Sequence, residues 1–285
     1  MKANAIRDSV PFLPLFVPAN RASRIPRAVA SGADAVIVDL EDAVGEEEKA
    51  SARASLFDAL AQPTFDVPIL VRVNAYGTPH FEDDLSAMAE LGIAGIVLPK
   101  AEMGVGLESI RERLGPGRAI VAIVETARGL AQARALARSA DRLAFGSIDY
   151  ADAIGAAHRR ETLLTARSEL VLAAALAPAA APIDGVTARF DAPEPVEDDA
   201  RYAHALGFGG KLLIHPAQIA PAIRGFAPES GDIDRAREVL ARVDDNATAV
   251  GGQMVDRPVI AAARRQVEAF ERAQARLAAL EGTRG

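Results

Sequence analysis

The regular alternation of apolar runs with helix-length segments between residues 12 and 216 most constrains the fold of this chain. Runs that stay apolar along their length are typical of strands buried on both faces, as in parallel sheets. The runs are FLPLFVP, AVIVDLED, ILVRVN, GIVLPK, AIVAIVET, RLAFGSID, APIDGV and KLLIHP. Eight strands that alternate strictly with helices predict an α/β fold of the (β/α)8 TIM-barrel type. No GxGxxG or GxxxxGK(S/T) motif follows the first run, which weakens an open nucleotide-binding sheet.

The residues after the eighth run have a different pattern. A helix near Ala217–Gly225 is expected to complete the barrel, and Asp232–Asp244 and Pro258–Leu280 have the composition of further helices. The segment NATAVGGQMVD between them is rich in turn residues and is expected to be irregular. We therefore predict a catalytic barrel domain over residues 1–226 and a C-terminal helical extension over 227–285 that packs on a neighbouring subunit.

Composition excludes several classes of protein. The chain has no cysteine, which rules out disulfides, thiolate catalysis and cysteine-ligated metals. Its net charge of −7 argues against a nucleic-acid partner. No signal-peptide pattern opens the chain, and the longest apolar tract, Leu170–Pro182, is too short to span a bilayer. We expect a cytoplasmic protein with no membrane partner.

Two carboxylates end neighbouring apolar runs, Glu125 the fifth and Asp149 the sixth. The carboxyl ends of adjacent parallel strands meet at the same edge of a sheet, so these side chains are expected to lie together. Two oxygen ligands suit a hard divalent cation that keeps positions open for substrate. Two acids that cap neighbouring helices would give the same pattern.

Polar side chains also end the other runs, at the face where barrels carry their active sites. This polar rim consists of Asp39, Glu41, Asp42, Arg72, Asn74, Lys100, Asp184 and His215. A histidine at a strand end is more often structural than catalytic, and no spacing supports a zinc site of three histidines.

Basic residues follow the first and sixth runs. Arg21, Arg24 and Arg27 come after VPAN, and His158, Arg159 and Arg160 come after GSIDYADAIG. Arginines beside helix N-termini bind phosphate, so both groups are candidates for a phosphate collar. Solvated arginines on a helix face are the alternative interpretation.

Taken together, the motifs resemble the citrate lyase β-subunit-like branch of the HpcH/HpaI aldolase superfamily. The resemblance rests on LFVPAN (15–20), GADAVIVDLEDAV (32–44), VRVN (71–74), VLPKAE (97–102), IVETARG (123–129), GSIDYADAIG (146–155), PIDGV (182–186), GFGGKLLIHPAQ (207–218) and a tail block containing GGQMVDRP. It implies a (β/α)8 barrel, in agreement with the strand count. Members of this superfamily include malyl-, citramalyl- and citryl-thioester lyases.

The resemblance also implies roles for individual residues. Glu125 and Asp149 match the ligands of Mg²⁺, and Arg72 matches an arginine that stabilises negative charge on substrate. Two catalytic acids, Glu41 and Asp42, match residues that order metal-bound water. Asp256 matches a tail aspartate that reaches the adjacent subunit's site as an acid or base. Arg21 and Lys100 lie where relatives contact CoA and the pocket, and Asn74, Arg27 and His215 are further candidates for substrate or CoA binding.

The reaction implied is a reversible Claisen-type cleavage of a 3-hydroxyacyl thioester, carried on CoA or an acyl-carrier protein, to an acetyl- or acyl-thioester and a 2-oxo acid. A homo-oligomer, trimeric or hexameric, is expected. An acyl-CoA thioesterase on the same scaffold and a non-catalytic CoA-binding subunit are the alternatives. Ala19 and Asn20 depart from the family's pattern after VP, and His158, Arg159 and Arg160 are not a family signature.

Overall fold

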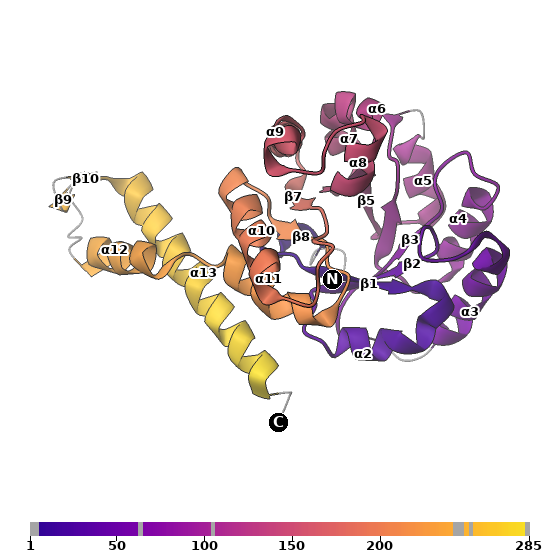
Figure 1. Ribbon diagram of the computed structural model, residues 1–285, viewed down its shortest axis with the longest axis horizontal. Coiled ribbons are helices and arrows are strands. Elements are labelled where there is room, and N and C mark those ends of the chain that lie inside the picture. Colours follow the sequence, from indigo (N-terminus) through magenta and orange to yellow (C-terminus); the bar gives the residue numbers. More distant parts are fainter. Residues whose placement is uncertain (1–5, 62–64, 104–105, 242–247, 251–252, 283–285) are drawn as a thin grey trace.

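The structure, a computed structural model, describes residues 6–61, 65–103, 106–241, 248–250 and 253–282. Within them, eight parallel strands follow one another in chain order around a single sheet, which confirms the (β/α)8 barrel (Figure 1). The strands are β1 Pro14–Pro18, β2 Ala35–Asp39, β3 Ile69–Arg72, β4 Gly95–Leu98, β5 Ala119–Val124, β6 Arg142–Phe145, β7 Ala180–Asp184 and β8 Gly210–Lys211. Parallel bridges from Phe12 to Gly210 and from Leu15 to Leu213 join the last strand to the first.

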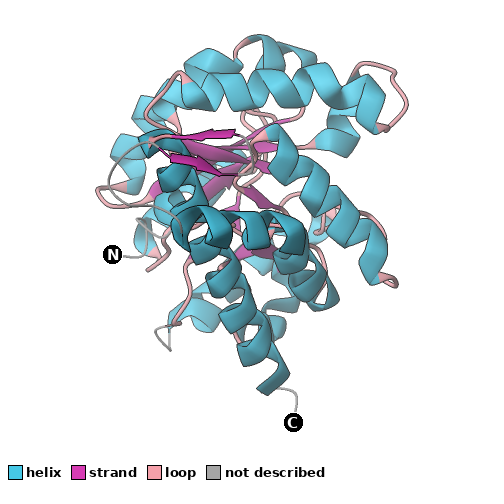
Figure 2. Cartoon of the chain, turned by 90° about the vertical axis from the view of Figure 1, so that its left-hand side faces the viewer, coloured by secondary structure: helices cyan, strands magenta, loops and turns pink. Residues whose placement is uncertain are grey.

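The strands are apolar because they are covered on both sides. Every residue of β2 and of β5 is buried. Alternate side chains point to opposite faces of a strand, so Val36 and Val38 belong to the core beneath the helices, whereas Ile37 belongs to the barrel interior. Figure 2 shows the strands inside and the helices around them.

Helices and short 3-10 turns connect the strands. They are η1 Ala19–Arg24, α2 Ile25–Val29, η2 Glu46–Glu48, α3 Lys49–Ala61, α4 Phe81–Glu90, α5 Leu107–Leu114, α6 Ala127–Ala131, α7 Ala133–Ser139, α8 Ser147–Ala153, α9 Arg160–Ala175, α10 Pro193–Leu206, η4 Pro216–Gln218 and α11 Ile219–Phe226. Local sequence fixes where some begin. Thr126 caps α6 by accepting a hydrogen bond from the Gly129 amide at 2.9 Å, and a proline opens α10.

The amino-terminal end of the barrel is closed by a buried arginine, and we call this layer the floor. Arg142, at the start of β6, is 0% exposed, and the Phe12 ring lies 5.1 Å from its guanidinium carbon. The guanidinium donates hydrogen bonds to four main-chain carbonyls, those of Ile6 (2.9 Å), Ser9 (3.2 Å), Ala181 (2.6 Å) and Gly209 (2.8 Å). Burial lowers the pKa of Arg142 to about 10.

The C-terminal extension consists of α12 Ser230–Ala241, a short antiparallel hairpin of β9 Thr248–Val250 and β10 Gln253–Val255, and α13 Arg257–Gly282. The expected helix over 232–244 is found as α12, although its last predicted residues lie outside the described part of the chain. The long helix is confirmed. The expectation of irregular structure before it was wrong, because β9 and β10 pair as antiparallel strands within this segment.

The extension is attached to the barrel through the far end of α13. Arg276 pairs with Asp34 at 3.0 Å, and Leu280 packs against Gly32. Gly32 and Asp34 precede β2, so this attachment lies at the floor. The opposite end of α13 projects away from the barrel with β9 and β10 (Figure 1). Among the described residues, no helix combines the length and apolarity needed to cross a membrane.

Candidate active site

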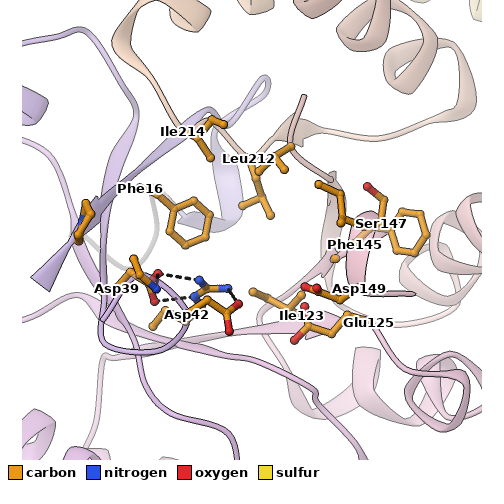
Figure 3. A pocket seen from close by; sticks show the side chains of 16 residues that line it. Phe16, Asp39, Asp42, Ile123, Glu125, Phe145, Ser147, Asp149, Leu212 and Ile214 are labelled. Carbon is orange, nitrogen blue, oxygen red and sulfur yellow. Dashed lines mark hydrogen bonds and ion pairs between the residues drawn. The ribbon is translucent and has the colours of Figure 1, made fainter. Parts of the chain in front are cut away.

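A cavity of about 430 Å³ opens at the carboxyl ends of the strands, where barrel enzymes carry their active sites. Figure 3 shows Asp39 and Asp42 on one side of it and Glu125 and Asp149 on another. Apolar side chains complete the lining, and they include Phe16, Ile123, Phe145, Leu212 and Ile214. The cavity therefore combines an apolar wall with charged groups at its edge.

Arg72, the last residue of β3, lines this cavity and is held in a fixed position. Its Nε and one terminal nitrogen donate to the two oxygens of Asp39, each at 2.7 Å, which is the bidentate geometry of a strong charge-assisted pair. Its other terminal nitrogen lies 3.2 Å from Glu41 and 3.4 Å from Asp42. Burial opposes its charge, yet the hydrogen bonds and charge of Asp39 raise the pKa of Arg72. The guanidinium is therefore permanently cationic.

Asp39 is a site residue to which the sequence analysis gave no role of its own. It is 2% exposed, and besides binding Arg72 it accepts hydrogen bonds from the amides of Glu41 (2.9 Å) and Ala43 (3.1 Å). One carboxylate thus fixes both the arginine and the loop after β2. A signal for the pairing exists in the sequence, because Asp39 and Arg72 end neighbouring strands and lie opposite each other in register.

Glu125 follows β5 and is 3% exposed. Its carboxylate accepts a hydrogen bond from the Lys100 amide at 2.6 Å. Lys100 adopts a left-handed conformation with φ of 48°, which is rare for a residue other than glycine. Burial and the nearby charges of Glu41 and Asp149 raise the pKa of Glu125 to about 8. The carboxylate is therefore short of compensating positive charge.

The sequence predicted that Asp149 ends a strand, and this prediction was wrong. Strand β6 ends at Phe145, and Asp149 lies in the first turn of α8, which begins at Ser147. The helix starts so soon after the strand that its first turn still faces the cavity, and Asp149 lines it together with Glu125 (Figure 3). Gly146 permits this close approach, since a Cβ atom there would overlap the Glu125 side chain.

Glu41 lies outside the cavity lining and contacts both Arg72 and Lys100. It is 6% exposed, forms an ion pair with the Lys100 ammonium, and approaches Arg72. Burial raises the pKa of Glu41 against the opposing effects of Arg72 and Lys100. Hydrogen bonds and ion pairs therefore connect the predicted residues Glu41, Asp42, Arg72, Lys100 and Glu125, and Asp149 lines the same cavity as Glu125.

Two other predicted rim residues have partners elsewhere. Asn74 is 3% exposed and donates its side-chain and main-chain N–H groups to Asp84, at 2.7 and 2.8 Å. His215 caps η4 by accepting a hydrogen bond from the Ala217 amide at 3.1 Å, and its ring stacks on Phe190. Neither residue lines the cavity.

The remaining predicted residues also lie outside the cavity lining. Arg21 and Arg27 are exposed on η1 and α2, and their side chains have no hydrogen-bond or ion-pair partner among the described residues. Asp256 directly precedes α13 and accepts a hydrogen bond from the Val259 amide at 3.1 Å. It therefore lies at the end of α13 that projects from the barrel (Figure 1).

The acidic pair is the candidate metal centre. In the described part of the chain, no group of three or more histidine and acidic side chains is arranged to hold a metal. Glu125 and Asp149 would thus supply two oxygen ligands, which leaves the other positions of a divalent cation to water and substrate. Magnesium is commonly bound in this way, through one or two carboxylates.

A parallel barrel with an anchored arginine and an acidic pair at its carboxyl face has the layout of a barrel enzyme. The family described as HpcH/HpaI aldolase/citrate lyase matches residues 13–216. The chain belongs to this family, which confirms the resemblance.

Named relatives and a solved structure are similar to this chain over most of its length. A citrate lyase subunit beta-like protein of Deinococcus radiodurans is 39% identical over 268 residues, covering 88% of this chain and 94% of the relative. A (3S)-malyl-CoA thioesterase of Cereibacter sphaeroides is 32% identical, covering 90% and 93%. The crystal structure of Mycobacterium tuberculosis CitE in complex with magnesium, acetoacetate and coenzyme A superposes with a TM-score of 0.79 at 33% identity, covering 92% of this chain and 98% of that one.

Proposed function

We propose that this protein is a magnesium-dependent carbon–carbon lyase that cleaves a 3-hydroxyacyl thioester, such as malyl-CoA, citramalyl-CoA or a citryl thioester, to an acetyl- or acyl-thioester and a 2-oxo acid. The observation that carries the proposal is the acidic pair Glu125 and Asp149, which shares a cavity with the anchored Arg72. The complex of the tuberculosis relative with magnesium and coenzyme A supports the choice of metal and carrier.

Glu125 and Asp149 are the residues that would hold Mg²⁺. Their fit to a divalent cation follows from the site itself, since burial and two neighbouring carboxylates raise the pKa of Glu125 and the Lys100 amide is its one hydrogen-bond donor among the described residues. When bound, the metal would act as a Lewis acid on the oxygens of the 2-oxo acid.

Arg72 would bind the negative charge that develops on oxygen. A guanidinium has five N–H donors, and Asp39 takes two of them, which leaves three for Glu41, Asp42 and the substrate. Because Asp39 fixes its orientation, Arg72 needs no rearrangement when charge develops, which is the condition for effective electrostatic catalysis.

The acid that protonates the thioester enolate would come from a second subunit. Asp256 is the candidate, and within its own chain it lies at the projecting end of α13, while the other end is fastened to the floor by Arg276 and Leu280. A projecting element of this kind can reach the carboxyl face of a neighbour. We therefore propose a homo-oligomer, trimeric or hexameric, in which the extension of residues 227–285 completes the adjacent site.

The experiment is an assay of malyl-, citramalyl- and citryl-CoA with and without Mg²⁺, in which 2-oxo acids are trapped with a hydrazine reagent. The variants Glu125→Ala and Asp149→Ala are compared with Asp152→Ala, which removes an exposed carboxylate from the same helix as Asp149. Lewis-acid stabilisation is worth several kcal/mol, so we expect oxo-acid formation to fall by about 10³-fold or more in the first two variants and without metal. Unchanged oxo-acid formation in Glu125→Ala would overturn the proposal.

A thioesterase is the second candidate, favoured by the Cereibacter relative that is named for that activity. Release of free CoA with an intact hydroxy-diacid would identify it. A protein that binds CoA but forms neither product would instead be a non-catalytic subunit.

Mixing two inactive variants tests the role of Asp256. Arg72→Lys subunits retain Asp256, and Asp256→Ala subunits retain Arg72. If each site is built from two chains, random reassembly of an equal mixture restores about one quarter of wild-type activity, because half the sites have each intact component. Activity that stays at the level of the separate variants would show that Asp256 does not act across a subunit boundary.

A further inference from the structure

A second cavity, of about 460 Å³, lies beside the candidate active site, between the start of α9 and the loop after β7. Val186 lines both cavities. Among the charged side chains that line the second cavity, five are basic and two, Glu161 and Asp199, are acidic. The basic side chains are Arg159, Arg160, Arg167, Arg189 and Lys211.

Internal partners satisfy three of these basic groups. Arg160 pairs with Asp198 and Asp199, at 2.7 and 2.8 Å. Arg189 pairs with Asp191, and the buried Lys211 ammonium donates to the Gly185 carbonyl at 2.6 Å. Arg167 pairs with Asp184 as well, so the donors that are left belong to Arg159 and to one terminal nitrogen of Arg167.

Arg167 is buried with an unused donor. Its side chain is 8% exposed, its Nε donates to Asp184 at 3.0 Å, and its guanidinium carbon lies 5.3 Å from the Phe145 ring centroid. Its Nη1 has no hydrogen-bond partner among the described residues. A buried unpaired donor is costly, so an acceptor that reaches this nitrogen is bound favourably.

Arg159 adds an exposed donor at the mouth of the cavity. Its side chain has no hydrogen-bond or ion-pair partner in the part of the chain that the structure describes. It directly precedes the 16-residue helix α9, whose N-terminus carries partial positive charge. Burial lowers the pKa of His158 and of Lys211, and the charge of Arg167 acts in the same direction on both, against the opposing charges of Asp184 and Asp199.

We propose that this second cavity is an anion-binding site that takes a phosphate group through Arg159 and Arg167. The planar donor fork of arginine matches the oxygens of phosphate, and two forks with free donors around one cavity can bind it from two directions. The site also contacts the candidate active site, since His158 hydrogen-bonds Ser147 at 3.0 Å and Phe145 lies against Arg167. The proposal does not depend on the reaction assigned to the first cavity.

Calorimetric titration of the full chain with inorganic pyrophosphate, in buffer without metal, tests the site. We expect saturable binding by the wild type, weakened about tenfold or more in Arg159→Ala, since one charge-assisted contact is lost. The matched control is Arg138→Ala, which removes an exposed arginine that also lacks a side-chain partner among the described residues and lies outside the cavity. Absence of saturable binding would overturn the proposal. Binding that survives in Arg159→Ala but is lost in Arg72→Lys would place the anion in the catalytic cavity and overturn it equally.

A second titration identifies whose phosphate the site takes. If CoA competes with bound pyrophosphate, and competition is lost in Arg159→Ala, the cavity holds the diphosphate of the thioester carrier. If CoA and pyrophosphate bind together, it holds a separate phosphorylated molecule. Neither titration uses Mg²⁺ or turnover, so failure here is distinguishable from failure of the proposed reaction.

Discussion

Two arginines stand at opposite ends of the same barrel, and their surroundings differ in kind. Arg72, at the carboxyl ends of the strands, is held by the carboxylates of Asp39, Glu41 and Asp42 beside a cavity. Arg142, in the floor, is held by main-chain carbonyls and is sealed from solvent. Each guanidinium lies about 5 Å from a phenylalanine ring of the β1 segment, Phe16 above and Phe12 below.

The partners decide what each arginine can do. Carboxylates raise the pKa of Arg72 and leave it donors that face the cavity, whereas burial lowers the pKa of Arg142 and its donors are spent on backbone from separate segments. A buried charge satisfied by carbonyls fixes a fold, while a charge anchored by acids at a cavity wall is available to a ligand. The same substitution at both ends therefore has different effects.

The largest expected effect on stability comes from Arg142→Lys. One ammonium cannot reach four carbonyls on separate segments, so at least one buried acceptor is left unpaired, and the unfolding free energy should fall by about 3 kcal/mol. The activity per folded molecule should not change. Urea unfolding measured together with kcat checks this, and a loss of kcat at unchanged stability would contradict the structural role of the floor.

The same change at the other end, Arg72→Lys, should reduce kcat by about 10²-fold, because a lysine cannot bind Asp39 in bidentate fashion and also present fixed donors to the substrate. Its melting temperature should fall less than that of Arg142→Lys. Steady-state kinetics at saturating Mg²⁺ and a thermal melt are the measurements. Equal losses of stability in Arg72→Lys and Arg142→Lys would contradict the assignment of a structural role to Arg142 and a catalytic role to Arg72.

A smaller change in kcat is expected for Asp39→Asn, which keeps the shape of the side chain but loses its charge and one acceptor. Orienting groups behind a site typically contribute 10- to 100-fold, so we expect a kcat loss of about tenfold or more with little change in KM. Asp34→Asn is the matched control, since Asp34 pairs with Arg276 at the floor. A loss of kcat as large in the control would show that Asp39 acts through general stability.

The smallest effect is expected for His215→Ala. Loss of the cap on η4 should cost about 1 kcal/mol of stability and leave kcat and the KM for a CoA thioester unchanged. Denaturant unfolding and steady-state kinetics measure both. A several-fold rise in KM would instead support the assignment of His215 to ligand binding.

The strands and much of the candidate site could be predicted because both follow from local patterns. Continuous apolar runs indicate buried parallel strands, and parallel strands bring their carboxyl ends together, which places Arg72 near Glu125. The position of Asp149 in α8 was not predicted, because sequence patterns locate the ends of strands and helices poorly. The partners of Asn74 and His215 could not be predicted, since Asp84 and Phe190 meet them only through tertiary packing. The hairpin before α13 was missed because its strands are three residues each.

The floor also sets the order in which the chain can fold during synthesis. Arg142 binds carbonyls of residues 6 and 9 at one end of the sequence and of residue 209 far along it, and the last strand segment meets the first through bridges from Phe12 to Gly210 and from Leu15 to Leu213. A nascent chain therefore exposes the open edge of its first strand on the ribosome until Gly210 has emerged. Contacts between segments far apart in the sequence slow folding, and the open edge of an unpaired strand promotes aggregation. Demand for chaperones should consequently concentrate in the interval before barrel closure.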